Sequence, residues 1–178
     1  ASHEALGRGL KHLRGVWDER LKRRGLTRLQ VAERMDRVSP GLDYSGFRRA
    51  DLVIEAVFED LDLKRRVLAE TEAATRDACV FATNTSSIPI GEIAKGCRRP
   101  AQVLGMHFFS PVHKMPLLEI VVTPETSLSA IATAATFGRR IGKHVIVVRD
   151  GPGFYTSRAL AAYMNEATWM LEEGAAVE

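Results

Sequence analysis

The chain has 178 residues, of which 46% are hydrophobic, and its formal net charge is +3. This length and composition predict a globular protein of one domain, or of one domain with part of another. No apolar run approaches the roughly 20 residues that span a bilayer. The first residues, Ala1 to Glu4, lack the basic start and apolar stretch of a signal peptide. Two cysteines do not make a disulfide framework, so we expect a reducing, cytoplasmic setting, with Cys79 as a small core residue.

Positive charge is concentrated in the first part of the chain. Residues 1–50 contain 12 Lys and Arg against 6 Asp and Glu, and the remaining residues contain 13 against 16. A basic segment attracts the phosphates of a nucleic acid or a cofactor, but it is also typical of a solvated helix face. Because no interleaved aromatic and basic residues, zinc spacing or nucleic-acid motif accompany it, we expect no nucleic-acid partner and no metal site.

The first 50 residues have helical periodicity. Apolar residues recur at steps of three and four from Leu6 to Leu21, which predicts an amphipathic helix over 4–24 that stops near Gly25. Thr27 is a candidate cap for a second helix that ends near Arg37. Ser39-Pro-Gly41 then breaks the pattern.

From residue 51 the pattern changes to short apolar strands that alternate with helices. Strands are predicted at 51–57, 79–83, 102–107, 117–122 and 144–148, and helices at 62–76, 90–94 and 127–141. Gly151-Pro-Gly153 interrupts the chain before a further helix over 154–173. This order predicts an α/β fold with a doubly wound, mainly parallel sheet, followed by the start of an all-helical domain.

Polar residues follow three of the predicted strands. They are Glu59 and Asp60, then Asn84-Thr-Ser-Ser87, then His107 with Ser110. Ligands of doubly wound sheets bind outside the carboxyl ends of the strands, so these loops are candidates for one site. Turn chemistry is the alternative, since Asn, Thr and Ser are common after any strand.

His107 is the most specific candidate. Glu119 follows 12 residues later inside the apolar run Leu-Leu-Glu-Ile-Val-Val. A buried carboxylate is costly unless it is paired, and an imidazole is a suitable partner. Such a pair fixes the ring tautomer and stabilises the imidazolium that forms when histidine acts as a base. A purely structural ion pair is the alternative.

Five segments, in this order and spacing, resemble the 3-hydroxyacyl-CoA dehydrogenase family, and most strongly the dehydrogenase part of the multifunctional fatty-acid oxidation α subunit. The segments are Asp51-Leu-Val-Ile-Glu-Ala-Val-Phe-Glu59, Asn84-Thr-Ser-Ser87, Gly105-Met-His-Phe-Phe-Ser-Pro111, Met115-Pro-Leu-Leu-Glu-Ile120 and Asp150-Gly-Pro-Gly-Phe154. The resemblance implies oxidation of an L-3-hydroxyacyl-CoA to the 3-ketoacyl-CoA, with NAD as the hydride acceptor.

The resemblance also implies roles for individual residues. His107 falls on the general base, Glu119 on the carboxylate that orients it, and Ser86 on the hydroxyl near substrate and nicotinamide. The implied cofactor contacts are Val57, Phe58, Glu59, Lys64, Asn84, Ser86 and Ser110. The implied substrate contacts are Ser86 and Ser157.

Two features depart from the family pattern. Ser157 stands where many relatives have Asn, so the reach of this side chain toward a substrate is shorter. A Rossmann half opens with a strand, a Gly-x-Gly-x-x-Gly turn and a helix, and this pattern is not found. Gly7 and Gly9 do not supply it, because they lie within a helical pattern and do not follow a strand. We therefore expect residues 1–149 to form an incomplete Rossmann-type NAD-binding domain. Residues 150–178 are expected to form the junction and first helix of a helical domain.

Three functions are compatible with these observations. The first is an NAD-dependent 3-hydroxyacyl-CoA dehydrogenase of fatty-acid β-oxidation, in which this segment alone is poorly active. It implies an acyl-CoA substrate and assembly as a homodimer or as an α/β fatty-acid oxidation complex. The second is a non-catalytic remnant that binds acyl-CoA or a partner protein through its basic first helix. The third is a related NAD-dependent dehydrogenase that acts on free 3-hydroxy acids.

Overall fold

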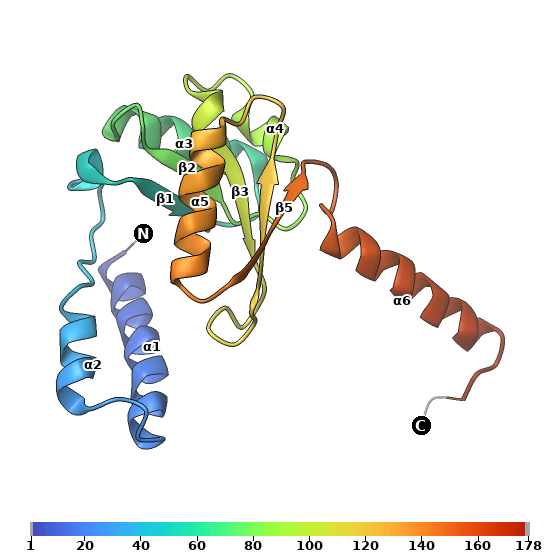
Figure 1. Cartoon of the computed structure of the whole chain (residues 1–178), viewed down its shortest axis with the longest axis horizontal. Helices are drawn as coiled ribbons and strands as arrows, with labels where there is room; N and C mark the ends of the chain where they lie inside the picture. Colours follow the sequence, from blue (N-terminus) through green and yellow to red (C-terminus); the bar gives the residue numbers. More distant parts are fainter. Residues whose placement is uncertain (1, 177–178) are drawn as a thin grey trace. The chain divides into compact units, whose positions relative to one another are not determined.

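The computed structural model describes residues 2–176 (Figure 1). The chain divides into two compact units, Ala1–Ser45 and Gly46–Glu178. The boundary predicted between residues 149 and 150 lies inside the second unit and stays a prediction.

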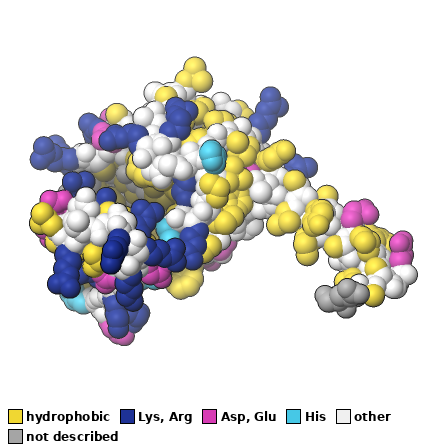
Figure 2. Space-filling view, turned by 60° about the horizontal axis from the view of Figure 1, so that its bottom comes forward, with side chains coloured by type: hydrophobic (Ala, Val, Ile, Leu, Met, Phe, Trp, Pro, Cys, Tyr) yellow, Lys and Arg dark blue, Asp and Glu magenta, His cyan; other side chains and the backbone are white. Residues whose placement is uncertain are grey.

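The first unit is a pair of helices, α1 (His3–Lys22) and α2 (Arg28–Met35). The Thr27 hydroxyl accepts from the Gln30 amide while the Gln30 side chain accepts from the Thr27 amide, a reciprocal cap that confirms the predicted start of α2. Arg34 of α2 lies 5.4 Å from the ring centroid of Trp17 in α1. Figure 2 shows Lys and Arg side chains gathered over this helix pair, so most of its positive charge faces solvent.

The second unit is built on a five-stranded sheet. Its strands are β1 (Leu52–Glu55), β2 (Val80–Thr83), β3 (Val103–Phe108), β4 (Leu117–Val122) and β5 (His144–Arg149). They lie in the order β1-β2-β3-β4-β5, and every neighbouring pair is parallel except β3 with β4. The predicted mainly parallel sheet is therefore confirmed, and the carboxyl ends of β1, β2 and β3 share one edge.

Helices cover both faces of this sheet (Figure 1). The helix α5 (Leu128–Arg140) packs on one face, and α3 (Leu61–Ala74) and α4 (Ile90–Ala94) pack on the other. Two short 3-10 turns, Phe47–Arg49 and Pro100–Gln102, precede β1 and β3. This two-faced cover explains why the strands are continuous apolar runs rather than alternating ones.

Alternation along β3 assigns its side chains to the two cores. Leu104 and Met106 pack with α5, whereas Val103 packs with α3 and α4. His107 therefore belongs to the face covered by α3 and α4. Gly105 lies on that same face, where an added Cβ would be 2.8 Å from the Ile90 side chain.

The last helix, α6 (Thr156–Glu172), contains no buried residue. Its exposed apolar residues are Leu160, Tyr163, Met164, Trp169, Met170 and Leu171. Figure 2 shows hydrophobic side chains along this helix. Among the described residues, no helix combines the length and apolar character needed to cross a membrane.

Candidate active site

His107 and Glu119 form the centre of the candidate site. They are directly opposite each other in the antiparallel pairing of β3 and β4, which places both side chains on one face of the sheet. The Nδ1 of His107 lies 2.7 Å from Oε2 of Glu119. Glu119 is completely buried and His107 is 6% exposed. The predicted contact is confirmed, and it satisfies a carboxylate that would otherwise be unpaired in the core.

The second oxygen of Glu119 also has partners. Its Oε1 accepts from both the amide and the hydroxyl of Thr156, each at 2.8 Å. Two aromatic rings pack on His107, with centroids 4.6 Å away for Phe109 and 5.6 Å away for Phe154. The imidazole is therefore held by a carboxylate at Nδ1 and by apolar surfaces around its ring.

The loop after β2 is tied to both neighbouring strands. The amide of Asn84 donates to the Glu55 carbonyl, and the Asn84 side-chain oxygen accepts from the Phe108 amide at 2.9 Å. Asn84 therefore joins the ends of β1, β2 and β3, which positions its neighbour Ser86 at the same edge as His107. Among the described residues, no hydrogen bond joins Ser86 directly to His107.

Glu59 accepts hydrogen bonds from the same loop. Its Oε1 accepts from the amides of Ser86 at 3.1 Å and Ser87 at 3.3 Å, and from the Thr85 hydroxyl. Burial by itself raises the pKa of Glu59, but hydrogen bonds from Thr85 and Ser86 and the charge of Lys64 outweigh it and lower the pKa to about 2. Glu59 is therefore an anion at neutral pH, and its carboxylate is hydrogen-bonded to the backbone amides of Ser86 and Ser87.

Lys64 is almost completely buried, with 1% of its side chain exposed. Its Nζ lies 3.0 Å from Oε1 of Glu55 and 3.2 Å from Oε2 of Glu59. Glu55 also accepts from the Thr83 hydroxyl at 2.7 Å and from the Val57 amide at 2.6 Å. In this conformation Lys64 has no exposed surface for a ligand, so its predicted cofactor contact stays a prediction and its observed contacts are structural.

Val57, Phe58 and Ser110 follow the carboxyl ends of their strands and have accessible side chains, whereas Ser157 lies in α6. Phe58 is 87% and Val57 36% exposed, directly after β1. Ser110 is exposed after β3, and Ser157 is half-buried in the first turn of α6. Their roles toward cofactor and substrate stay predictions.

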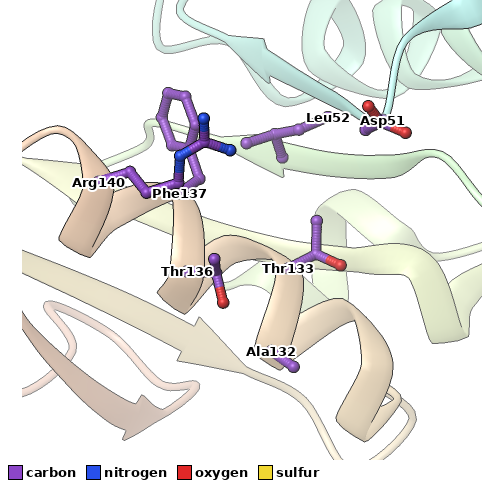
Figure 3. A pocket seen from close by; sticks show the side chains of 7 residues that line it. All are labelled: Asp51, Leu52, Ala132, Thr133, Thr136, Phe137 and Arg140. Carbon is purple, nitrogen blue, oxygen red and sulfur yellow. The ribbon is translucent and has the colours of Figure 1, made fainter.

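One cavity lies at the opposite end of β1 from these residues. A cavity of about 430 Å³ separates the amino end of β1 from α5 (Figure 3). Asp51 and Leu52 line it on one side, and Thr133, Phe137 and Arg140 line it on the other. It contains none of the predicted site residues, because they follow the carboxyl ends of the strands.

Sequence reasoning missed three residues of this constellation. Glu55 had a usable signal, because it is a carboxylate inside the apolar run of β1, as Glu119 is in β4. Thr85 had no distinct signal, because it lies within a run of hydroxyl residues. Thr156 had no local signal, because its contact with Glu119 depends on how the chain returns after β5.

The junction after β5 is also attached to the site. Asp150 accepts from the amides of Ile90 and Gly91, both at 2.8 Å, at the start of α4. Phe154 is 3% exposed and has a left-handed φ of 50°, which is rare for a bulky residue. The segment from Asp150 to Thr156 therefore connects α4, His107 and Glu119.

A mainly parallel sheet covered by helices on both faces, with polar loops after the carboxyl ends of β1, β2 and β3, defines a Rossmann-type domain. The family model described as "3-hydroxyacyl-CoA dehydrogenase, NAD binding domain" matches residues 1–151. This chain belongs to that family.

Individual relatives agree with this assignment. The fatty acid oxidation complex subunit alpha of Idiomarina loihiensis is 51% identical over 161 residues, which are 90% of this chain and 23% of the relative. The chain thus spans about a quarter of the length of the curated relatives it matches. The 3-hydroxybutyryl-CoA dehydrogenase of Escherichia coli K12 superposes with a TM-score of 0.94 at 32% identity, covering 98% of this chain and 37% of that one. The (S)-3-hydroxybutyryl-CoA dehydrogenase of Ralstonia eutropha gives 0.94 at 33%, covering 98% and 62%.

The family assignment also supports the expected cofactor, NAD. Val57, Phe58, Ser86 and Ser110 are exposed in the loops that follow β1, β2 and β3, at the sheet edge where His107 lies, so their side chains are accessible to a cofactor. A pyrophosphate is usually held by a unit in which a strand is followed directly by a glycine-rich turn and a helix. The described residues do not include such a unit. Gly7 and Gly9 lie inside α1, as expected.

Proposed function

We propose that this chain carries the acid–base half of an NAD-dependent L-3-hydroxyacyl-CoA dehydrogenase of fatty-acid β-oxidation. One observation carries the proposal: the His107 imidazole at the carboxyl end of β3 is bonded through Nδ1 to the buried carboxylate of Glu119. This arrangement leaves Nε2 to take a proton.

In the proposed mechanism, His107 Nε2 accepts the proton of the substrate 3-hydroxyl. Glu119 keeps the proton of the ring on Nδ1, and its charge stabilises the imidazolium that results. Bound NAD supplies the hydride acceptor. The Ser86 hydroxyl donates a hydrogen bond to the reacting oxygen, and Phe109 and Phe154 exclude water from the imidazole.

Other side chains position these groups. Glu59 and Asn84 hold the Ser86 loop, so we infer that they act on cofactor binding through its geometry. Val57, Phe58 and Ser110 are proposed to contact NAD, and Ser157 the substrate. Lys64 is proposed to act through Glu59, which it contacts from its buried position.

We also propose an acyl-CoA substrate and assembly as a homodimer or in an α/β fatty-acid oxidation complex. The names of the curated relatives, subunits alpha of such a complex, support this. The free thiols of Cys79 and Cys97 support a reducing, cytoplasmic location.

The function is tested in a hybrid protein in which residues 1–178 replace the matching segment of the Idiomarina loihiensis relative. We expect reduction of acetoacetyl-CoA by NADH, and a loss of about 10²- to 10⁴-fold in kcat for His107→Gln with acetoacetyl-CoA binding retained. His113→Gln, at an exposed histidine outside the site, is the matched control. Full turnover by the His107→Gln hybrid would refute the proposal, and an inactive hybrid that still binds acyl-CoA would favour the non-catalytic alternative. Turnover of free 3-hydroxy acids in preference to thioesters would favour the other alternative, a related NAD-dependent dehydrogenase that acts on free 3-hydroxy acids.

The 178-residue chain by itself is expected to bind NAD weakly and to turn over poorly, because residues 2–176 include no glycine-rich turn after a strand to hold the pyrophosphate. Calorimetric titration with NAD measures the affinity, and the assay with acetoacetyl-CoA and NADH measures the turnover. Near-normal turnover by the chain alone would contradict this expectation.

A further inference from the structure

We propose that Thr156 is a positioning residue that orients His107 through Glu119, so that the start of α6 sets the geometry of the acid–base pair. The proposal deepens the function proposed above and rests on it for its catalytic consequence.

The two oxygens of Glu119 have different partners. Oε2 contacts His107 Nδ1 at 2.7 Å, and Oε1 accepts two hydrogen bonds from Thr156 at 2.8 Å. Because Glu119 is completely buried, solvent does not replace a lost donor. Donors on one oxygen and the imidazole on the other together fix the plane of the carboxylate, and with it the ring of His107.

Thr156 has two separable donors. It is the first residue of α6, so its amide is one of the free N–H groups at a helix start, where an anion is favoured. Any residue at this position other than proline supplies that amide, but only Thr and Ser supply the hydroxyl. The contribution of the side chain can therefore be removed without removing the backbone donor.

The segment that carries Thr156 is anchored independently of this contact. Phe154 is buried against His107, and Asp150 binds the amides of Ile90 and Gly91. Thr156 therefore approaches Glu119 from a segment that is held in place. Loss of its hydroxyl should leave the backbone unchanged and loosen only the carboxylate and the imidazole.

The first test follows the Nδ1 proton of His107 by NMR in the 178-residue chain labelled with ¹⁵N-histidine, with assignment by His107→Gln. In the native chain we expect a Nδ1–H tautomer whose proton is protected from exchange. Thr156→Val should speed that exchange about tenfold, as expected for loss of a buried hydrogen bond to a charged group. Thr156→Ser should restore native exchange.

The matched control is Thr168→Val. Thr168 lies in the same helix, and its hydroxyl bonds the Met164 carbonyl instead of the site. We expect no change at His107 in this variant. If Thr156→Val perturbs the far-UV circular dichroism, Thr156→Ala is compared with Thr156→Ser in its place.

The second test uses the hybrid protein. Thr156→Val should lower kcat about tenfold with the KM for acetoacetyl-CoA within about twofold, and Thr156→Ser should recover most of kcat. Unchanged exchange of the His107 proton in Thr156→Val would overturn the proposal, whatever the role of His107. If Thr156→Val alters the exchange in the 178-residue chain but the His107→Gln hybrid keeps full activity, the contact is upheld. Only the proposed function is then refuted.

Discussion

The ammonium of Lys64 lies 3.0 Å from the carboxylate of Glu55, and both side chains are 1% exposed. Removing one member of a buried pair leaves the other charge unpaired, which typically costs about 3–5 kcal/mol. We therefore expect Lys64→Met to lower the free energy of unfolding by about this amount, measured by urea denaturation. Lys95→Met, at an exposed lysine, should change it by less than about 0.5 kcal/mol.

A double variant separates the charge from the packing. Glu55→Gln combined with Lys64→Met removes both buried charges, so it should be more stable than Lys64→Met alone. If the double variant is less stable than Lys64→Met, burial of an unpaired carboxylate is not the cause of the loss.

Glu59 should make stability depend on pH. Its pKa is about 2 in the folded chain against 4.5 for a free side chain, so the folded state favours the anion. This contribution is fully present above about pH 4.5 and is lost as the pH falls toward 2. The difference in Tm between the native chain and Glu59→Gln, measured by circular dichroism, should therefore be largest near neutral pH and shrink between pH 5 and about pH 3. A difference that stays constant over this range would contradict the assignment.

Gly105 should not tolerate a side chain. A Cβ there would lie 2.8 Å from Cδ1 of Ile90 and 2.9 Å from Cβ of Val121, both in the core beside His107. We expect Gly105→Ala to destabilise by about 1–3 kcal/mol through overpacking. Gly9→Ala provides the matched comparison, because Gly9 lies in α1 with nothing within 4 Å, and it should stabilise by about 0.5–1 kcal/mol. Chemical denaturation of both variants checks the opposite signs.

The two thiols should react slowly while the chain is folded. Burial raises the pKa of both Cys79 and Cys97, and Cys79 is only 4% exposed. Mass spectrometry after brief treatment with N-ethylmaleimide at pH 7 should find Cys79 unlabelled and Cys97 labelled slowly. In urea both should label fully. Rapid labelling of Cys79 in the folded chain would contradict its position in the core.

Most elements of the fold were predictable from local pattern. The observed α4 has the predicted bounds, Ile90–Ala94, and β4 has the bounds predicted for it, Leu117–Val122. Strand β1 is shorter than predicted and ends at Glu55, after which the Val57 amide bonds the Glu55 side chain rather than a neighbouring strand. Periodicity indicates where an apolar run begins and ends, but it does not show whether a backbone amide at the end of the run bonds a neighbouring strand or a side chain.

The pairing of His107 with Glu119 was predictable for a different reason. A carboxylate inside an apolar strand needs a partner, and this requirement is visible in the order of residues. The same requirement applies to Glu55, but its partner Lys64 lies on a helix of mixed charge that gives no local sign of burial.

The sequence by itself therefore determined the alternation of strands and helices, the family, and the need for a partner at Glu119, because each depends on residue types at short spacing. Only the tertiary structure decided that Lys64 is buried between Glu55 and Glu59, and that Thr156 completes the contacts of Glu119. These contacts join segments far apart in the chain. They exist because packing of the sheet and its helices excludes water and leaves each buried charge to the donors that the fold brings beside it.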